Sequence, residues 1–378
     1  MEGVNRGLTV TILDRDHISV GASIRNFGHC CITAQTGAMV DLAELSRERW
    51  LAVAGQAGFW VEASGAYAIA RSEPEKAVLD EMAAAKGPEK VDILDADTVR
   101  QRFADSGAGL DDRTIAAVFL KDDLRVDPRT TVAKLAEWLS HQPGVRFHWG
   151  TSVTGLADGV VHTTRGRVFG DHVYVCVGHD LDYLLPDVAA HYRVERCALQ
   201  MALVVAPVGM KLNQAVLTGT SMLRYNAFAE TQAATFLESG MRESRPELFD
   251  IGANIMLTRR PDGTLLIGDS HHYAETVDPF LDEDITDLLI AEAGRILGTD
   301  TLRVLQRWQG VYASSSVSPL LVHSPIPGVT AVSVTSGIGM TVAFGLAYAN
   351  ISTLHSTSEA NRPWMHKPTH TPIEVHHA

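Results

Sequence analysis

The 378-residue sequence has 45 acidic and 32 basic side chains and a formal net charge of −13. No Lys/Arg-rich run occurs, so nucleic acid and anionic membrane surfaces are unfavourable partners. The length exceeds the ~250–300 residues at which single cores stop growing, so we expect two domains.

The four cysteines, Cys30, Cys31, Cys176 and Cys197, follow neither a CxxC pattern nor a disulfide framework. This usage favours a reducing cytoplasm. The sequence lacks a run of about 18 apolar residues, and its start lacks the apolar core of a secretory signal. We therefore expect a cytoplasmic protein without integral membrane association.

The first half of the chain alternates between strand and helix patterns. The apolar run Leu8–Asp14 predicts a buried parallel strand. A second strand is expected at 59–70, and helices are expected at 38–55, 73–86, 95–103 and 127–139. Ser72 and Asp127 are the expected N-caps of two of these helices.

The second half continues this alternation. Strands are expected at 145–149, 200–205, 254–258 and 265–269, with a meander at 152–178 and a helix at 282–297. The block 329–354 is the most patterned, because a strand, a glycine-rich turn and a small-residue helix follow one another. This order is typical of the anion-facing geometry of nucleotide-binding folds.

Asp14 ends its predicted strand as the ribose-binding acid of a dinucleotide fold does. In that fingerprint the acid follows the glycines by about 20 residues, but only 13 residues precede Asp14. Either the sequence starts after the glycine loop, or the first strand has been lost. In the next segment, Gly21–His29, small residues permit close approach and polar ones could bind a pyrophosphate; a polar surface loop is the alternative.

Three blocks in order resemble the D-amino-acid-oxidase superfamily of FAD-dependent oxidoreductases: Leu8–His29, His172–Gly178 and Thr335–Ala347. Within that superfamily, the chain most resembles the oxidoreductases associated with phosphonate catabolism. This resemblance is carried by GASIRNFG, by Leu199–Met201, by Ile267–Tyr273 and by Arg307–Ala313.

The resemblance implies an α/β fold with two domains. A Rossmann-like FAD-binding domain would be built from residues 1–48, 140–185 and 305–360, without the first strand and its GxGxxG. A substrate domain with a mixed or antiparallel sheet would comprise residues 49–139 and 186–304. The tail, 361–378, is expected to be poorly ordered.

The resemblance also implies FAD as the cofactor. The residues expected to bind it are Asp14, Arg15, Ser23, Arg25, Asn26, Phe27, Gly28, Val153, Gly178, Gly337, Gly339, Met340 and Thr341. Hydride transfer to flavin N5 needs no catalytic triad, so we assign no catalytic side chain. Oxygen or a quinone would be the electron acceptor.

Amino-acid oxidases of this superfamily hold the substrate carboxylate with an arginine in a GxRP segment, since a guanidinium matches a carboxylate bidentately. Here that segment reads Gly310–Ala313, with Tyr312 in place of arginine. A second arginine of glycine oxidases falls at Thr335 or Ser336. We therefore expect a small primary or secondary amine, which the resemblance suggests is an aminoalkylphosphonate. The alternatives are a glycine, sarcosine or D-amino-acid oxidase, and a truncated inactive remnant.

Substrate-binding candidates lie in the family-like blocks, and a structural role stays open for each. They are Gln200, Arg224, Tyr225, His271, Arg307, Tyr312 and His29, with His272 beside them. The scattered His370, His376 and His377 do not form a convincing metal site, and we expect no metal.

Overall fold

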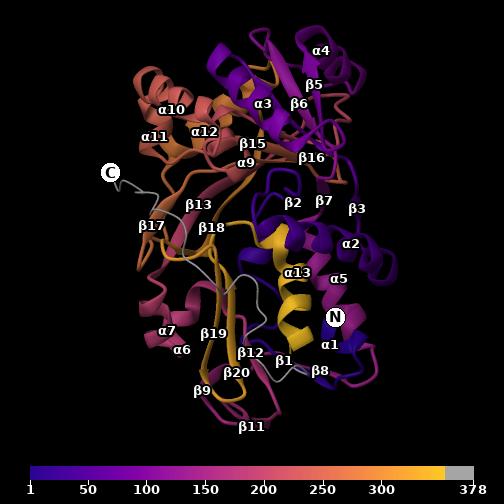
Figure 1. The fold of residues 1–378 in the computed structure, drawn as a ribbon, viewed down its shortest axis with the longest axis vertical. Helices are drawn as coiled ribbons and strands as arrows, with labels where there is room; N and C mark the ends of the chain where they lie inside the picture. Colours follow the sequence, from indigo (N-terminus) through magenta and orange to yellow (C-terminus); the bar gives the residue numbers. More distant parts are fainter. Residues whose placement is uncertain (354–378) are drawn as a thin grey trace.

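The computed structural model describes residues 1–353, so the expectation for the tail 361–378 lies outside the described residues. A long mixed sheet with helices on its faces occupies one end of the molecule. Shorter sheets and the last helix form the other end (Figure 1). The expected α/β class, with a multi-stranded mixed sheet, is confirmed.

The long sheet has nine strands in the order β17-β13-β16-β15-β14-β4-β6-β5, with β18 paired to β13. The bounds are β4 (Ala66–Ala70), β5 (Val91–Asp95), β6 (Ala116–Leu120), β13 (Val194–Val205), β14 (Ala215–Leu217), β15 (Met256–Arg259), β16 (Thr264–Gly268), β17 (His272–Ala274) and β18 (Val304–Ser315). Only β14 and β4 run parallel; the other pairs are antiparallel.

Alternation along β4 separates two apolar cores. Ala66, Ala68 and Ala70 enter one core, while Tyr67 and Ile69 enter the other, as the period of two in a strand requires. The helices beside this sheet are α3 (Glu73–Lys86), α4 (Ala96–Asp105), α8 (Gly219–Met222), α9 (Asn226–Ala229), α10 (Gln232–Ser244), α11 (Pro246–Asp250) and α12 (Glu283–Ile296).

The other end contains smaller sheets. β1 (Val10–Leu13) pairs in parallel with β8 (Val145–His148), and β12 (Val173–Val175) pairs in parallel with β20 (Val329–Val334), which also pairs with β19 (Leu320–Ile326). A meander consists of β9 (Val153–Ala157), β10 (Val160–Thr163) and β11 (Gly166–Phe169). A fourth small sheet consists of β2 (His29–Cys30), β7 (Leu124–Val126) and β3 (Val61–Glu62).

Helix α13 (Gly339–Ser352) packs against α2 (Met39–Ala57). A Cβ at Gly345 would lie 2.2 Å from the carbonyl oxygen of Leu42, so this contact requires glycine. The remaining helices are α1 (Glu2–Asn5), η1 (Ala22–Ile24), α5 (Pro128–Ser140), η2 (Gly178–Asp180), α6 (Leu181–Leu184) and α7 (Pro186–His191). No helix within residues 1–353 is long and apolar enough to cross a membrane.

Several predicted elements are found close to their expected bounds. The helix expected at 38–55 is α2, and the one expected at 282–297 is α12. The expected single strand at 59–70 is wrong, because Ser64 and Gly65 separate β3 from β4. Gly65 has φ +67°, and its amide bonds to the carbonyl of Asp123, so the backbone turns there and the two halves join different sheets.

Candidate functional site

A row of polar side chains crosses three strands of the long sheet. Tyr312 on β18 lies opposite Cys197 on β13, which lies opposite Tyr273 on β17. Directly opposed residues point to the same face, so the two phenols flank the thiol. Burial raises the pKa of Cys197 to about 12, so the thiol stays protonated and neutral.

Arg224 reaches this row from the turn after α8. Its Nη1 lies 3.4 Å from the hydroxyl of Tyr273, and its Nη2 donates to the carbonyl oxygen of Gly252 at 2.7 Å. No carboxylate within residues 1–353 forms an ion pair with Arg224. The partly buried guanidinium therefore has free donors beside the two tyrosines.

Asp269 and His271 lie on the same side of this arginine. Burial raises the pKa of Asp269 to about 7, although Arg224 opposes the change and Asn254 donates to the carboxyl at 3.0 Å. Burial and the nearby Arg224 hold the pKa of His271 well below its usual value. The His271 Nδ1–H donates to the Gly252 carbonyl at 3.0 Å, and the ring centroid lies 6.4 Å from that of Tyr312. Arg224 is therefore the dominant cation of this group near neutral pH.

The segment before β2 is held by its own polar side chains. Asn26 donates to the carbonyls of Ala22 and Ser23 and accepts from the amide of Gly28. A Cβ at Gly28, where φ is +64°, would lie 2.0 Å from the Val126 carbonyl oxygen, so only glycine fits. Asn26 and Gly28 thus shape this loop from within.

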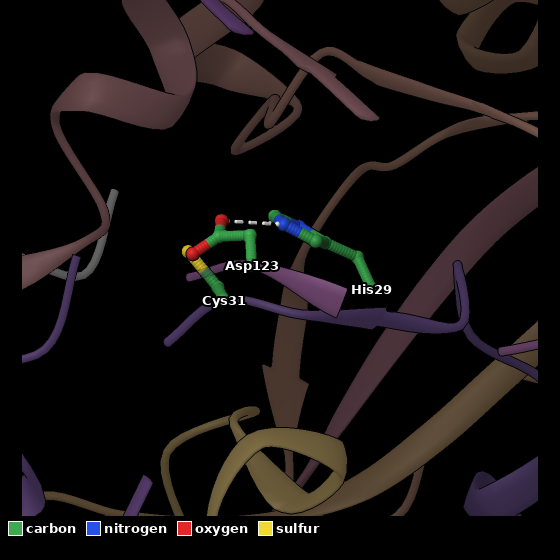
Figure 2. A group of neighbouring side chains, drawn as sticks. All are labelled: His29, Cys31 and Asp123. Atoms are coloured by element: carbon green, nitrogen blue, oxygen red, sulfur yellow. Dashed lines mark hydrogen bonds and ion pairs between the residues drawn. The ribbon is translucent and has the colours of Figure 1, made fainter. Parts of the chain in front are cut away.

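A second group of buried polar residues lies where β2 meets β7. The His29 Nε2 lies 2.8 Å from Asp123 Oδ2, and the Asp123 Oδ1 accepts from the amide of Thr33 at 2.8 Å. His29, Cys31 and Asp123 have side-chain donor atoms within 4.8 Å of one another, and Figure 2 shows the three side chains converging. Hydrogen bonds within the group account for this closeness, and we assign it no metal.

The comparisons with known proteins identify the family. A family model described as FAD dependent oxidoreductase (DAO) matches residues 2–349. The chain belongs to this family. Its cofactor is therefore FAD, and its activity is that of an oxidoreductase.

Several solved structures have a similar fold. Glycine oxidase from Bacillus cereus ATCC 14579 is 17% identical with a TM-score of 0.72, covering 92% of this chain and 89% of that one. Glycine oxidase from Geobacillus kaustophilus is 17% identical with a TM-score of 0.74, covering 93% and 89%. Iminodiacetate oxidase from Chelativorans sp. BNC1 is 15% identical with a TM-score of 0.70, covering 93% and 90%. No curated protein sequence matches.

The residues at the ends of the parallel strands suit the FAD of this family. Helix α13 begins at Gly339 without a side-chain cap, so its first amides are available to an anion. No atom lies within 4 Å of a Cβ built at Gly21, Gly178 or Gly339, so a ligand can approach the backbone there. These positions come from the three blocks expected to contact FAD.

The other residues expected to contact FAD lie in several elements, and some of them already bond to other protein groups. Met340 and Thr341 are in the first turn of α13, Gly337 precedes it, Val153 starts β9, and Ser23 is in η1. Arg25 donates to the Gln309 carbonyl, and Phe27 is buried and accepts from Thr258. The Asp14 carboxylate accepts from the Asp16 amide, and Arg15 pairs with Asp180 at 2.7 Å. Their roles toward FAD stay predictions.

The structure brings together some of the predicted substrate residues and not others. Arg224, Tyr225, His271 and Tyr312 gather at one end of the long sheet. Arg307 instead pairs with Glu283 at 3.0 Å, and the Gln200 amide lies 2.9 Å from Thr286, both on the side covered by α12. We do not retain Arg307 and Gln200 in the proposed site.

Sequence reasoning missed four residues of these groups: Tyr273, Cys197, Asp269 and Asp123. Tyr273 and Asp269 lie within the IGDSHHY block, and that block could have indicated them. Cys197 needs the register of β13 to be placed. Asp123 is one of several acids in a loop, and nothing in its sequence neighbourhood distinguishes it.

Proposed function

We propose that this protein oxidises a small amine that carries an anionic group, and that the amine is an aminoalkylphosphonate or its N-alkyl derivative. The primary product is an imine, which water hydrolyses to an aldehyde and ammonia or a smaller amine. Membership of the FAD dependent oxidoreductase family supports the reaction class. The phosphonate group follows from the resemblance and from the cation described next.

The single observation that carries the proposal is the partly buried guanidinium of Arg224, which forms no ion pair within residues 1–353. It does interact electrostatically with the buried Asp269, and the hydroxyls of Tyr273 and Tyr312 lie in the same group. A cation withdrawn from water is costly unless an anion pairs with it. A phosphonate or carboxylate would supply that anion, and charge-assisted bonds to it are the strong ones.

The side chains of this site have separable tasks. Arg224 binds the anionic end of the substrate and so orients the amine end. Tyr273 and Tyr312 are neutral donors, because burial raises the pKa of both phenols. The apolar neighbours in the same core, such as Leu199 and Met201, exclude water. When bound, FAD supplies the acceptor for the hydride.

A second candidate is oxidation of a glycine- or sarcosine-like amino acid. A guanidinium pairs with a carboxylate as readily as with a phosphonate, so Arg224 does not by itself separate the two. Two of the similar folds are glycine oxidases. A third possibility, from another class, is a protein without catalytic activity.

Anaerobic reduction of the FAD-loaded protein tests the proposal. We expect 2-aminoethylphosphonate or its N-methyl derivative to bleach the flavin absorbance, and glycine, sarcosine and D-alanine to do so far less. Preference for the carboxylates would establish the second candidate. If no amine reduces the bound flavin, the amine-oxidising function is wrong. Reoxidation with oxygen and with a soluble quinone then identifies the acceptor.

Arg224→Met tests the anion site in the same experiment. A hydrogen bond to a charged group is worth about 1.5–3 kcal/mol, so the substrate concentration for half-maximal reduction should rise about 10- to 150-fold. Arg307→Met is the matched control, because Arg307 pairs with Glu283 away from the site. Equal effects of the two changes would remove Arg224 from the site.

A further inference from the structure

The imidazole of His29 is oriented by a buried carboxylate. His29 and Asp123 have side chains that are 2% and 0% exposed, and their Nε2 and Oδ2 atoms lie 2.8 Å apart. The amide of Thr33 donates to the other oxygen of Asp123. The Asp123 carboxyl accepts from the ring at Nε2–H, which leaves the lone pair on Nδ1.

That Nδ1 atom is buried and has no hydrogen-bond partner within the described part of the chain. Buried polar atoms are nearly always paired, so an orphan atom calls for an explanation. The ring is anchored at one nitrogen by a carboxylate, and the other nitrogen is left with a free lone pair. This is the arrangement of an oriented base that lacks its proton donor.

The position of His29 connects the two halves of the site. Two residues further on, the amide of Cys31 donates to Thr341 Oγ1 in the first turn of α13, where FAD contacts are expected. On the other side, Tyr225 interacts electrostatically with Cys31 and Asp123 as well as with Arg224. Phe27, Cys31, Tyr225 and Tyr312 pack in one core. The residues next to His29, Cys31 and Asp123, therefore connect the start of α13 with the surroundings of Arg224.

We propose that His29, held by Asp123, accepts the proton that the substrate ammonium must lose before oxidation. This inference rests on the proposed function. The N–H bond of R–NH₃⁺ breaks, its proton forms a bond to Nδ1, and its electron pair remains on the amine nitrogen. That pair forms the C=N bond of the iminium as the α-carbon gives up its hydride to FAD, the two-electron acceptor of this family, and the Asp123 carboxyl holds the protonated ring by its hydrogen bond until the proton passes to water.

The neighbouring titratable groups do not compete for this proton. Burial raises the pKa of Cys31 and of Tyr225 well above their usual values, so both stay protonated and neutral. Cys30 is likewise a buried, neutral thiol. Arg125, opposite His29 in the strand register, directs its guanidinium to the carbonyls of Asn213 and Arg259. Within residues 1–353, Asp123 is the one carboxylate that forms a hydrogen bond with the ring.

The test is the pH profile of flavin reduction, measured anaerobically by stopped flow for the wild type, His29→Gln and Asp123→Asn. General base catalysis contributes about 100-fold or more, so His29→Gln should reduce at least about 100-fold more slowly at pH 7. Its rate should then rise steadily with pH as free amine becomes available. Asp123 is a positioning residue, so Asp123→Asn should shift the profile and lower the rate less.

A pH indicator in the same mixing experiment gives a readout independent of turnover. When a non-oxidisable amine binds, the wild type should keep the amine proton on His29, and the indicator should not change. In His29→Gln the proton that the bound amine loses should pass to solvent, and the indicator should report its release. His141→Gln is the matched control, because His141 is an exposed histidine at the end of α5 and belongs to neither group of the site. Far-UV circular dichroism and flavin stoichiometry establish folding, and Asp123→Asn decides the test if His29→Gln does not fold.

Two outcomes would overturn the inference in distinguishable ways. If amines reduce the wild type and both variants with the same rates and pH profiles, His29 has no such role and the proposed function stands. If no amine reduces the wild-type flavin, the proposed function and this inference both fail.

Discussion

The two ends of the molecule differ in whether side chains cap the first backbone amides of the helices compared here. Around the long sheet, the helices α3, α10 and α12 begin with side-chain caps from Ser72, Thr231 and Asp282. At the other end, α13 begins at Gly339 without a side-chain cap. Those three helices use side chains to cap their own first amides, whereas the first amides of α13 are left for a ligand.

The two ends also differ in how many apolar residues their cores bury. The core that contains Phe103 has 22 buried apolar residues, whereas the core around Leu321 has seven. Strand β4 is buried at every position, but β1 has an exposed residue and three half-buried ones. We infer that the long sheet carries most of the intrinsic stability. The end that contains α13, where we expect FAD to bind (the FAD end), would gain stability from the cofactor.

The largest expected effect is in the long-sheet core. Phe103→Ala should lower the free energy of unfolding by about 3–5 kcal/mol, because it opens a cavity among tightly packed neighbours. Leu321→Ala, at the FAD end, should cost less, about 2–3 kcal/mol, because a small core can collapse around the gap. Urea unfolding of both variants without FAD measures the contrast, and a larger loss for Leu321→Ala would reverse it.

Local sequence signals, rather than the end of the molecule, decided which parts of the fold could be predicted. Helices α2, α5 and α12 were expected within two residues of their ends, since apolar spacing and caps such as Asp127 are local signals. The short strands β2, β3 and β7 were not separated from their surroundings, because two or three residues carry no periodicity. Their pairing depends on contacts distant in sequence, such as His29 with Arg125.

The next effect is a pH dependence of stability from Asp269. Its pKa in the folded protein is about 7, raised by burial from the ordinary 3.8, so folding favours the protonated carboxyl. Stability from this group is full below about pH 4 and is lost as pH rises to about 7, by up to about 4 kcal/mol in total. Asp269→Asn should remove that slope in urea unfolding between pH 4 and 8. Asp97→Asn, at a fully exposed carboxylate, should leave it unchanged.

The candidate site was only partly predictable for a related reason. Arg224 and Tyr312 stood out because a motif placed them, whereas Asp123 and Cys197 gain their significance from partners on other strands. A buried dyad such as His29–Asp123 joins residues 94 positions apart. No spacing pattern along the chain predicts such a pair.

FAD should stabilise the two ends unequally. A ligand at 100 times its dissociation constant stabilises the folded state by about 2.7 kcal/mol. Hydrogen exchange of amides in α13 and β12 should slow on adding FAD, whereas exchange in β4 and β15 should change little. Uniform protection of all four elements would show that the two ends unfold as one unit, which removes the proposed difference in stability.

The smallest effect tests whether the caps of the long-sheet end are independent of the cofactor. Thr231 Oγ1 accepts from the amide of Ala234 at the start of α10, and losing such a cap costs about 1 kcal/mol. Thr231→Ala should lower the free energy of unfolding by about that amount, with FAD affinity unchanged, because the hydroxyl bonds only to Ala234 and to the Phe228 carbonyl, both beside the long sheet. Thr231→Ser keeps the hydroxyl and should restore most of the loss. If Thr231→Ala instead weakens FAD binding in an absorbance titration, the long-sheet end and the end that contains α13 are coupled. The long sheet would then help to hold the cofactor site in place.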